Sequence, residues 1–403
     1  MAGRPDGASS PRRVLVLSAD IGGGHDATGR ALEERARRLW PGSAIEWADT
    51  LDVMGRGVGR AFRRIYVTSV ELTPWLYQCF YAALWRHRWF TRAVKRFVGA
   101  WAGRRLAPLV EDCRPDVILS TYPLASAGLA WLREHRGLRV PTGAWVSDFA
   151  PHPMWVYPRL DLTLVMHPAA VPLAAAVAPG ARIAVCAPPV AAGFRPGDRA
   201  AARRRAGLDP ARPAVVISCG SLGFGAVEEA VRALVGGVPA VTVVVVCGRN
   251  AALRRRLTRL PAPPGRLRVL GWVDRMPELL RSADLLVTNG GGVTVLEAIA
   301  AGVEIAMYRP IAAHGAANAA LLTAAGLAET FRDPARFAAW VRARFAAAPP
   351  GATAGPAAPG ILPDLGLPTL LRHRAPLSDL MSGCADVCLR DHDARRGRTI
   401  GLP

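Results

Sequence analysis

Three consecutive glycines, Gly290, Gly291 and Gly292, follow a short apolar segment in the second half of the chain and precede an apolar helical segment. Glycines let a ligand approach the backbone closely, and the unpaired N–H groups at a helix start attract phosphate. Thr294 lies at the expected helix start, and Glu297, one turn further, offers a carboxylate to ribose hydroxyls. The spacing predicts a pocket for a nucleotide diphosphate, although an ordinary strand-to-helix turn has the same appearance.

A second glycine-rich turn lies earlier in the same half of the chain. Gly220, Ser221 and Gly223 follow an apolar segment and precede a helical one. A turn of this kind at a helix start suits a pyrophosphate. The motif is unspecific by itself, but two such turns in one half of the chain favour a shared donor pocket.

The first half of the chain has its own glycine-rich turn, in which Gly22, Gly23 and Gly24 precede His25. The turn does not match the G-x-G-x-x-G fingerprint, which disfavours a nicotinamide site. It predicts an open loop for an acceptor or an anion. At a helix start, His25 is a candidate general base or anion contact, and the plainer alternative is a polar residue without a role.

A carboxylate, Asp148, comes directly after a short apolar segment that ends with Trp145 and Val146. Ligands bind beyond the carboxyl ends of strands in open α/β sheets. Asp148 is therefore a second candidate for the catalytic base, and the alternative is a turn or helix-capping aspartate.

Apolar segments alternate with helical patterns through most of the chain, as is typical of parallel strands covered on both faces. We expect two Rossmann-like α/β domains, residues 12–190 and 214–346, facing across a cleft. Residues 191–213 form a helical connector, and residues 347–403 have a Pro-, Ala- and Gly-rich composition typical of a linker or disordered tail. The expected strands are residues 14–18, 45–48, 116–120, 140–146 and 162–166, then 215–218, 241–247, 267–270, 284–287 and 304–307.

The segment from residue 55 to residue 105 is rich in arginine and aromatic residues and has a single acidic residue, Glu71. At about 100° per residue, apolar and basic side chains fall on opposite faces of a helix near residues 88–101. The pattern suits a helix lying in an anionic membrane surface, and the alternative is a helix packed on its own domain. The residues expected at the membrane are Trp85, Trp89, Phe90, Arg92, Lys95, Phe97 and Trp101.

The composition disfavours several other classes of function. The formal net charge is +20, but Lys95 is the only lysine and no nucleic-acid-binding motif accompanies the arginines, so we expect no nucleic-acid partner. The seven cysteines lack a framework spacing, which favours a reducing cytoplasm. Cys384, Cys388 and His392 recur every four residues without an evident fourth ligand, and we expect no metal and no cofactor. No apolar run reaches the roughly 18 residues of a membrane span.

Seven features occur in one order along residues 12–330. They are SADIGGGHDATGRAL, SDFAPHPMW, APPVAAGF, CGSLGFG, VVVVCGRN, LGWVDRMPELLRSADLLVTNGGGVTVLEA and a closing Asn318. This order resembles the monogalactosyldiacylglycerol synthase and diacylglycerol glucosyltransferase family, relatives of the peptidoglycan N-acetylglucosaminyltransferase. The resemblance implies a GT-B fold whose C-terminal domain binds a UDP-sugar and whose N-terminal domain binds a lipid acceptor and lies on the membrane.

The resemblance also implies roles for single residues. His25 and Asp148 match the family's acceptor-side functional positions, and the basic aromatic segment falls where relatives carry membrane-binding helices. The implied donor-side residues are Gly220, Ser221 and Gly223 at the pyrophosphate, Arg249 in the donor cleft and Glu297 at the ribose.

Two departures from the family pattern concern the substrates. Family members usually carry a Gln or a Gln-Glu pair just before the residue matched by Asn318, and those side chains contact the sugar. His314 and Gly315 occupy the corresponding positions here, so His314 and Asn318 are included in the predicted donor site. The usual His-Pro-Leu is Tyr122-Pro123-Leu124. The identity of the donor sugar is left open by these changes.

The leading hypothesis is an inverting, metal-independent glycosyltransferase that moves galactose or glucose from a UDP-sugar to a membrane lipid such as diacylglycerol. His25 or Asp148 would remove the acceptor proton. The expected location is the cytoplasmic face of the cell membrane, as a peripheral protein. The alternatives are a UDP-sugar 2-epimerase-like enzyme, which would be soluble, and a catalytically inactive UDP-sugar-binding relative.

Overall fold

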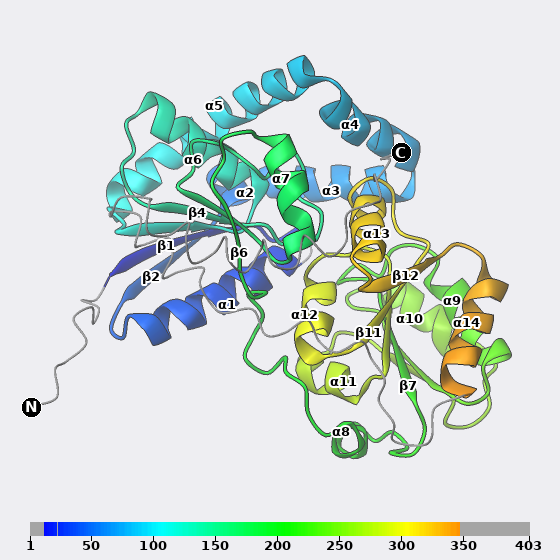
Figure 1. Cartoon of the computed structure of the whole chain (residues 1–403). Coiled ribbons are helices and arrows are strands. Elements are labelled where there is room, and N and C mark those ends of the chain that lie inside the picture. Colours follow the sequence, from blue (N-terminus) through cyan, green and yellow to red (C-terminus); the bar gives the residue numbers. More distant parts are fainter. Residues whose placement is uncertain (1–11, 22, 347–403) are drawn as a thin grey trace, which may run out of the picture.

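Two six-stranded parallel sheets form the centres of two α/β domains (Figure 1). The structure, a computed structural model, describes residues 12–21 and 23–346. The first sheet has the strand order β2-β1-β3-β4-β5-β6. The first domain contains β1 (Arg13–Ser18), α1 (Gly24–Leu39), β2 (Ala44–Asp49), α2 (Thr50–Val53), α3 (Val58–Glu71), α4 (Pro74–Arg86), α5 (Arg88–Cys113), β3 (Val117–Ser120), α6 (Pro123–His135), β4 (Thr142–Trp145), β5 (Leu162–Val165), the 3-10 helix η1 (Pro168–Ala170), α7 (Val171–Val177) and β6 (Ile183–Val185).

The second sheet has the strand order β12-β11-β10-β7-β8-β9. Its inner strands are continuously apolar and buried, because helices cover both faces of the sheet. The remaining elements are α8 (Arg199–Arg205), β7 (Ala214–Ser218), α9 (Val227–Gly237), β8 (Thr242–Val246), α10 (Ala251–Thr258), β9 (Leu267–Leu270), α11 (Met276–Ser282), β10 (Leu285–Thr288), α12 (Val293–Ala301), β11 (Glu304–Tyr308), α13 (His314–Ala324), β12 (Ala328–Phe331) and α14 (Pro334–Ala346).

Both sheets have a point at which the direction of strand addition reverses. In the first sheet β1 lies between β2 and β3, and in the second β7 lies between β8 and β10. The connections on the two sides of such a point diverge and leave a crevice at the carboxyl ends of the strands. The three predicted glycine turns follow β1, β7 and β10, so the topology brings them to the crevices where ligands bind.

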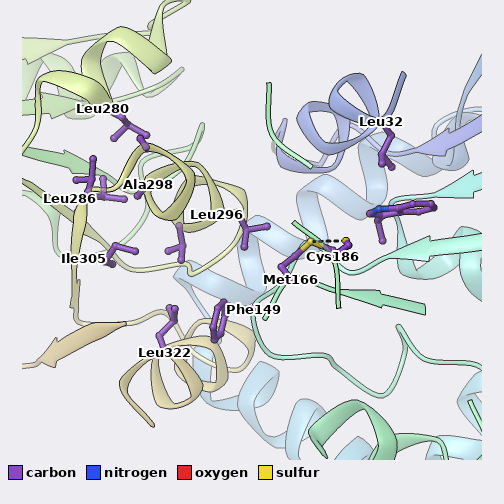
Figure 2. Packing of buried hydrophobic residues seen from close by; sticks show 14 of the residues in the cluster. Leu32, Phe149, Met166, Cys186, Leu280, Leu286, Leu296, Ala298, Ile305 and Leu322 are labelled. Carbon is purple, nitrogen blue, oxygen red and sulfur yellow. Dashed lines mark hydrogen bonds between the residues drawn. The ribbon is translucent and has the colours of Figure 1, made fainter. Parts of the chain in front are cut away.

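Apolar side chains from both domains form one buried cluster, part of which is drawn in Figure 2. Phe149, Met166 and Cys186 belong to the first domain, and Leu296 and Leu322 belong to the second. The domains are therefore packed against each other next to the cleft as well as linked by the chain.

The long connection between β2 and β3 forms the helices α3, α4 and α5. Small residues let α5 pack closely on α6: a Cβ added at Gly103 would lie 2.2 Å from Trp131, and one added at Gly128 would lie 2.7 Å from Leu106. The helices α3 and α4 continue away from the first sheet and reach α13 of the second domain (Figure 1). We call α3, α4 and α5 the insertion.

The strands predicted from the sequence are present, with ends that differ by one or two residues at most positions. Two edge strands were not predicted, because β6 is only half-buried and β12 is largely exposed, so neither has a continuous apolar run. The predicted connector, residues 191–213, contains α8. The predicted tail lies outside the described residues, and so do Cys384, Cys388 and His392.

Candidate active site between the two domains

Contacts between the domains join the turn after β1 to the second domain. A Cβ added at Gly24 would lie 3.4 Å from Val293, the first residue of α12, and one added at Gly23 would lie 3.9 Å from Trp272. The predicted acceptor loop and donor turn thus face each other across the cleft. Gly22, predicted in the same loop, lies outside the described residues.

The imidazole of His25 is oriented from one side. Its Nδ1 lies 2.8 Å from the carbonyl oxygen of Thr121, after β3, and 3.1 Å from Ser147 Oγ, after β4. A carbonyl oxygen only accepts, so Nδ1 carries the proton and Nε2 is left as the basic nitrogen. Within the described chain, Nε2 has no hydrogen-bond partner.

Burial keeps this imidazole neutral. Burial lowers the pKa of His25 below its usual value of 6.5, and the charge of Asp148 opposes that effect. The rings of Tyr122 and Trp155 lie beside it, with centroids 5.1 and 5.8 Å away. A neutral imidazole with a free Nε2 can accept a proton from a hydroxyl placed in the cleft.

Asp148 is held by its neighbours and does not hydrogen-bond to His25 among the described contacts. Trp155 Nε1 donates to Asp148 Oδ2 at 3.0 Å, and Asn318 Nδ2 donates to Oδ1 at 3.5 Å. The charge of Asp148 raises the pKa values of His25, His152 and His314, although burial dominates at each. Asp148 thus acts on three histidines through its charge, and both of its carboxylate oxygens already accept a hydrogen bond from the protein.

The glycines of the donor turns differ in what surrounds them. Gly220 has φ +74°, and nothing lies within 4 Å of a Cβ added there, nor of one added at Gly290 or Gly292. A Cβ added at Gly223 would instead lie 3.1 Å from the Cys247 carbonyl oxygen. The first three glycines leave open backbone for a ligand, whereas Gly223 is required by packing.

Arg249, which the resemblance implies in the donor cleft, lies beside the turn that contains Ser221. Its backbone N–H donates to the Ser221 carbonyl oxygen at 2.7 Å, and its guanidinium lies 4.7 Å from the centroid of the Trp272 ring. Trp272 is half exposed and also adjoins Gly23. The stack holds the positive charge of Arg249 close to Trp272, between the turn that contains Ser221 and the turn that contains Gly23. Trp272 was not predicted from the sequence, where a single tryptophan in a loop carries no signal.

Glu297 and Thr294 lie on the first turns of α12, as predicted. Burial raises the pKa of Glu297 to about 8, and the described chain supplies no hydrogen bond or ion pair to its carboxyl group. A partly buried carboxyl group without a partner in the protein is costly to ionise. Its position beside the open glycines leaves it available to ligand hydroxyls.

Asn318 lies deeper than the prediction of a donor contact implies. It is fully buried; its Oδ1 accepts from the Ala150 N–H at 2.7 Å, and its Nδ2 donates to the Gly290 carbonyl oxygen at 3.0 Å. A Cβ added at Gly291 would lie 2.4 Å from Asn318 Cβ, so Gly291 is required by this packing. Asn318 thus ties the loop after β4 to the donor turn, and its contact with the donor stays a prediction.

His314 begins α13 and faces two tyrosines of the insertion. Tyr77 OH lies 3.1 Å from its Nδ1, and Tyr66 OH lies 3.5 Å from its Nε2. Burial lowers the pKa of His314, so the ring is neutral. Neither tyrosine was predicted as a site residue, because the sequence gives no sign that residues 66 and 77 meet residue 314.

The predicted membrane face of α5 needs two corrections. Lys95 Nζ donates to the Val156 carbonyl oxygen at 2.8 Å and lies 4.6 Å from the Tyr157 ring centroid, and burial lowers its pKa to about 8. Trp101 stacks on Phe62 against the domain core. Lys95 contacts residues 156 and 157 after β4, and Trp101 contacts α3, so both side chains point into the domain.

Other predicted membrane residues are exposed on the insertion. Trp89 is 70% exposed and Phe97 is 73% exposed, and Arg92 is exposed as well, whereas Trp85 and Phe90 are half-buried. Helices α3 and α4 and the turn between them add exposed apolar side chains that were not predicted individually. These are Ile65, Leu72, Trp75, Leu76 and Phe80.

Among the described residues there is neither a metal-binding cluster nor a helix that could span a membrane. No group of three or more His, Cys, Asp or Glu side chains in residues 12–21 and 23–346 is arranged to hold a metal ion. In the same part of the chain, every helix is too short or too polar to cross a bilayer. A cavity of about 510 Å³ lies at the amino ends of β4, β5 and β6, away from the cleft, and contains none of the predicted site residues.

Comparisons with known proteins agree with the geometry. The family model described as "Monogalactosyldiacylglycerol (MGDG) synthase" matches residues 25–190, and the "Glycosyltransferase family 28 C-terminal domain" matches residues 214–338. A processive diacylglycerol beta-glucosyltransferase of Bacillus subtilis (strain 168) is 28% identical over 324 residues, which are 76% of this chain and 80% of the relative.

Two solved structures illustrate the likeness of fold. MurG of Acinetobacter baumannii has a TM-score of 0.51 at 17% identity, covering 83% of this chain and 91% of its own. Anabaena Alr3699/HepE in complex with UDP and glucose has a TM-score of 0.54 at 15% identity, covering 92% of this chain and 100% of its own. At these identities the likeness concerns the fold, which is GT-B.

Proposed function

The chain belongs to the monogalactosyldiacylglycerol synthase family of GT-B glycosyltransferases, and we propose that this hexosyltransferase moves galactose or glucose from a UDP-sugar to diacylglycerol with inversion at the anomeric carbon. One observation carries the proposal. A neutral His25 with a free Nε2 directly follows Gly24, which lies against Val293 at the start of α12, next to the open glycines of the donor turn.

His25 is the base in the proposed reaction. Its Nε2 takes the proton of the lipid hydroxyl while that oxygen forms a bond to the anomeric carbon. The bond from this carbon to the UDP oxygen breaks in the same displacement, which inverts the configuration. The hydrogen bond from Nδ1 to Thr121 supports this assignment, because it fixes the tautomer that leaves Nε2 basic.

Asp148 acts through its charge in this scheme. When His25 takes the proton, an imidazolium forms in a partly buried site, and a nearby carboxylate stabilises it. Both oxygens of Asp148 accept hydrogen bonds, from Trp155 and Asn318, which supports a fixed negative charge over a second base.

UDP leaves against backbone N–H groups at two helix starts and beside the guanidinium of Arg249. Gly220 and Gly292 expose backbone at the turns before α9 and α12, and the positive ends of these helices favour the diphosphate. Arg249, stacked on Trp272, adds a positive charge on the same side. Glu297 receives the ribose hydroxyls, which supply the partners that its carboxyl group lacks.

The insertion is the proposed membrane-binding surface. Its exposed aromatic and aliphatic side chains lie on three consecutive helices that carry an excess of arginine. Exposed apolar residues with basic neighbours suit the interface of an anionic bilayer. We place the protein on the cytoplasmic face of the cell membrane by this proposal.

The test uses the whole chain and vesicles that contain diacylglycerol and an anionic lipid. Radiolabelled UDP-galactose and UDP-glucose are supplied in parallel, and label is measured in the organic phase. Transfer with one donor and a product of opposite anomeric configuration is the expected result. UDP binding without transfer to diacylglycerol from either donor would contradict the proposal, and omitting diacylglycerol provides the control.

A further inference from the structure

The insertion crosses from the first domain to the donor side of the cleft. Helices α3 and α4 belong to the first domain in sequence, yet their side chains contact the start of α13 in the second domain. Tyr66 comes from α3, and Tyr77 and Gln78 come from α4. The three side chains converge on two consecutive residues, Ala313 and His314.

The two ring nitrogens of His314 are both used by this contact. Tyr77 OH lies 3.1 Å from Nδ1, and Tyr66 OH lies 3.5 Å from Nε2. A neutral imidazole has one donor and one acceptor nitrogen, and a hydroxyl can satisfy either. The pair of tyrosines therefore holds the ring in one plane and prevents it from turning about its side-chain torsions.

The third contact fixes the backbone before α13. Gln78 Oε1 accepts from the Ala313 N–H at 2.6 Å. Ala313 has φ +63°, a conformation that residues with a side chain rarely adopt and that persists only where the surroundings support it. Gln78 supplies that support from the other domain.

This contact lies against both donor turns. The ring of Tyr66 is 6.2 Å from that of Phe224, in the turn after β7. A Cβ added at Gly315 would lie 2.9 Å from the Asn289 carbonyl oxygen, in the turn after β10. His314 is also close enough to His25 to influence its pKa. The contact thus lies between the diphosphate turns and the base, where the donor sugar must be bound.

We propose that Tyr66, Tyr77 and Gln78 are positioning residues for the donor sugar: they hold His314 and the first turn of α13, so that the first domain completes the sugar end of the donor pocket. This rests on the proposed function. The sugar end would be assembled only when α3 and α4 are docked on the second domain, whereas the UDP end is built by the second domain alone.

The experiment distinguishes binding of the UDP part of the donor from binding of its sugar. Calorimetric affinities for UDP and for the UDP-hexose that the wild type uses are measured for the double variant Tyr66→Phe/Tyr77→Phe, for His314→Ala and for the triple variant. In the double variant, we expect UDP-hexose affinity to fall about tenfold and KM for the donor to rise equally, with UDP affinity unchanged. In the His314→Ala background, the tyrosine changes should add less than about twofold, because their target is gone.

A matched control is Tyr157→Phe, a buried tyrosine whose hydroxyl has no hydrogen-bond partner in the described chain and which lies in the first domain. It should leave both affinities unchanged. If the double variant folds poorly, Gln78→Leu tests the same contact from an exposed position and should raise KM for UDP-hexose about threefold.

Unchanged UDP-hexose affinity in the double variant, or effects that add fully to that of His314→Ala, would overturn the inference. A wild-type chain that binds no UDP would instead overturn the proposed function.

Discussion

The two sides of the cleft are built from different groups. The donor side consists mainly of backbone, with open glycines before two helices and a single unpaired carboxyl group, Glu297. The acceptor side consists of titratable side chains, His25 and Asp148, whose atoms are held by neighbouring strand ends and by Asn318. In the proposed mechanism, binding of the diphosphate and transfer of the proton therefore depend on separate residues, so single variants should affect one and not the other.

The largest expected effect comes from removing the base. His25→Ala should lower kcat about 10²- to 10⁴-fold, because general-base catalysis contributes that range. UDP affinity should stay within about twofold of the wild type, since the open glycines of the donor turns are untouched. Single-turnover transfer and calorimetry measure the two quantities, and a variant that retains its rate would remove His25 from the mechanism.

Replacing the donor carboxyl group should affect binding instead. Glu297→Gln is expected to weaken UDP binding about tenfold or more, as for loss of hydrogen bonds to a charged group. Thermal unfolding of the UDP-free protein provides a second readout. Because burial raises the folded pKa of Glu297 to about 8, above its unfolded value, ionisation opposes folding increasingly from about pH 4.5 to about pH 8.

Glu297→Gln should therefore raise Tm more at pH 8 than at pH 5. An equal change at both pH values would show that the carboxyl group is not buried in solution.

Substitutions on the exposed surface of the insertion should weaken membrane binding and leave both hexose transfer chemistry and UDP binding unchanged. Trp89→Ser/Phe97→Ser is expected to weaken sedimentation with anionic vesicles about tenfold, since each aromatic ring loses part of its burial in lipid. Lys95→Met is the contrasting variant, because Lys95 points into the domain; it should change Tm but not vesicle binding. Weaker vesicle binding by Lys95→Met, with unchanged binding by Trp89→Ser/Phe97→Ser, would instead support the predicted basic membrane face of α5.

The smallest expected effect is a shift in the pH profile. Burial lowers the pKa of His25 below 6.5, so kcat/KM should be flat near pH 7 to 8 and fall as the pH drops through that lowered pKa. The charge of Asp148 raises this pKa, so Asp148→Asn should move the acidic limb to still lower pH. A limb that moves to higher pH would contradict the electrostatic role given to Asp148.

Local sequence patterns predicted the strand, turn and helix of the donor side because these elements are close in sequence. The strand, the glycines and Glu297 lie within one turn and one helix, so their spacing alone sets their geometry. His25 followed from the same kind of turn. Its orientation did not, since Thr121 and Ser147 come from the ends of β3 and β4.

Contacts between distant segments explain what the sequence pattern missed. The meeting of Tyr77 with His314 joins residues far apart in the chain, and no periodicity encodes it. The assignment of Lys95 to a membrane face failed because periodicity separates the two faces of a helix without saying which one is covered. Gly103 marks the face of α5 that packs on α6, but the sequence does not show that α6 is its partner.

The central claim is that UDP binding and proton transfer depend on different sides of the cleft. The most direct test compares one variant from each side in the same two assays. UDP affinity and single-turnover transfer of hexose to diacylglycerol at saturating donor are measured for His25→Ala and Glu297→Ala. The account predicts that His25→Ala loses transfer and keeps UDP binding, whereas Glu297→Ala loses UDP affinity and transfers at near the wild-type rate. Loss of both properties in both variants, or retained transfer in His25→Ala, would contradict it.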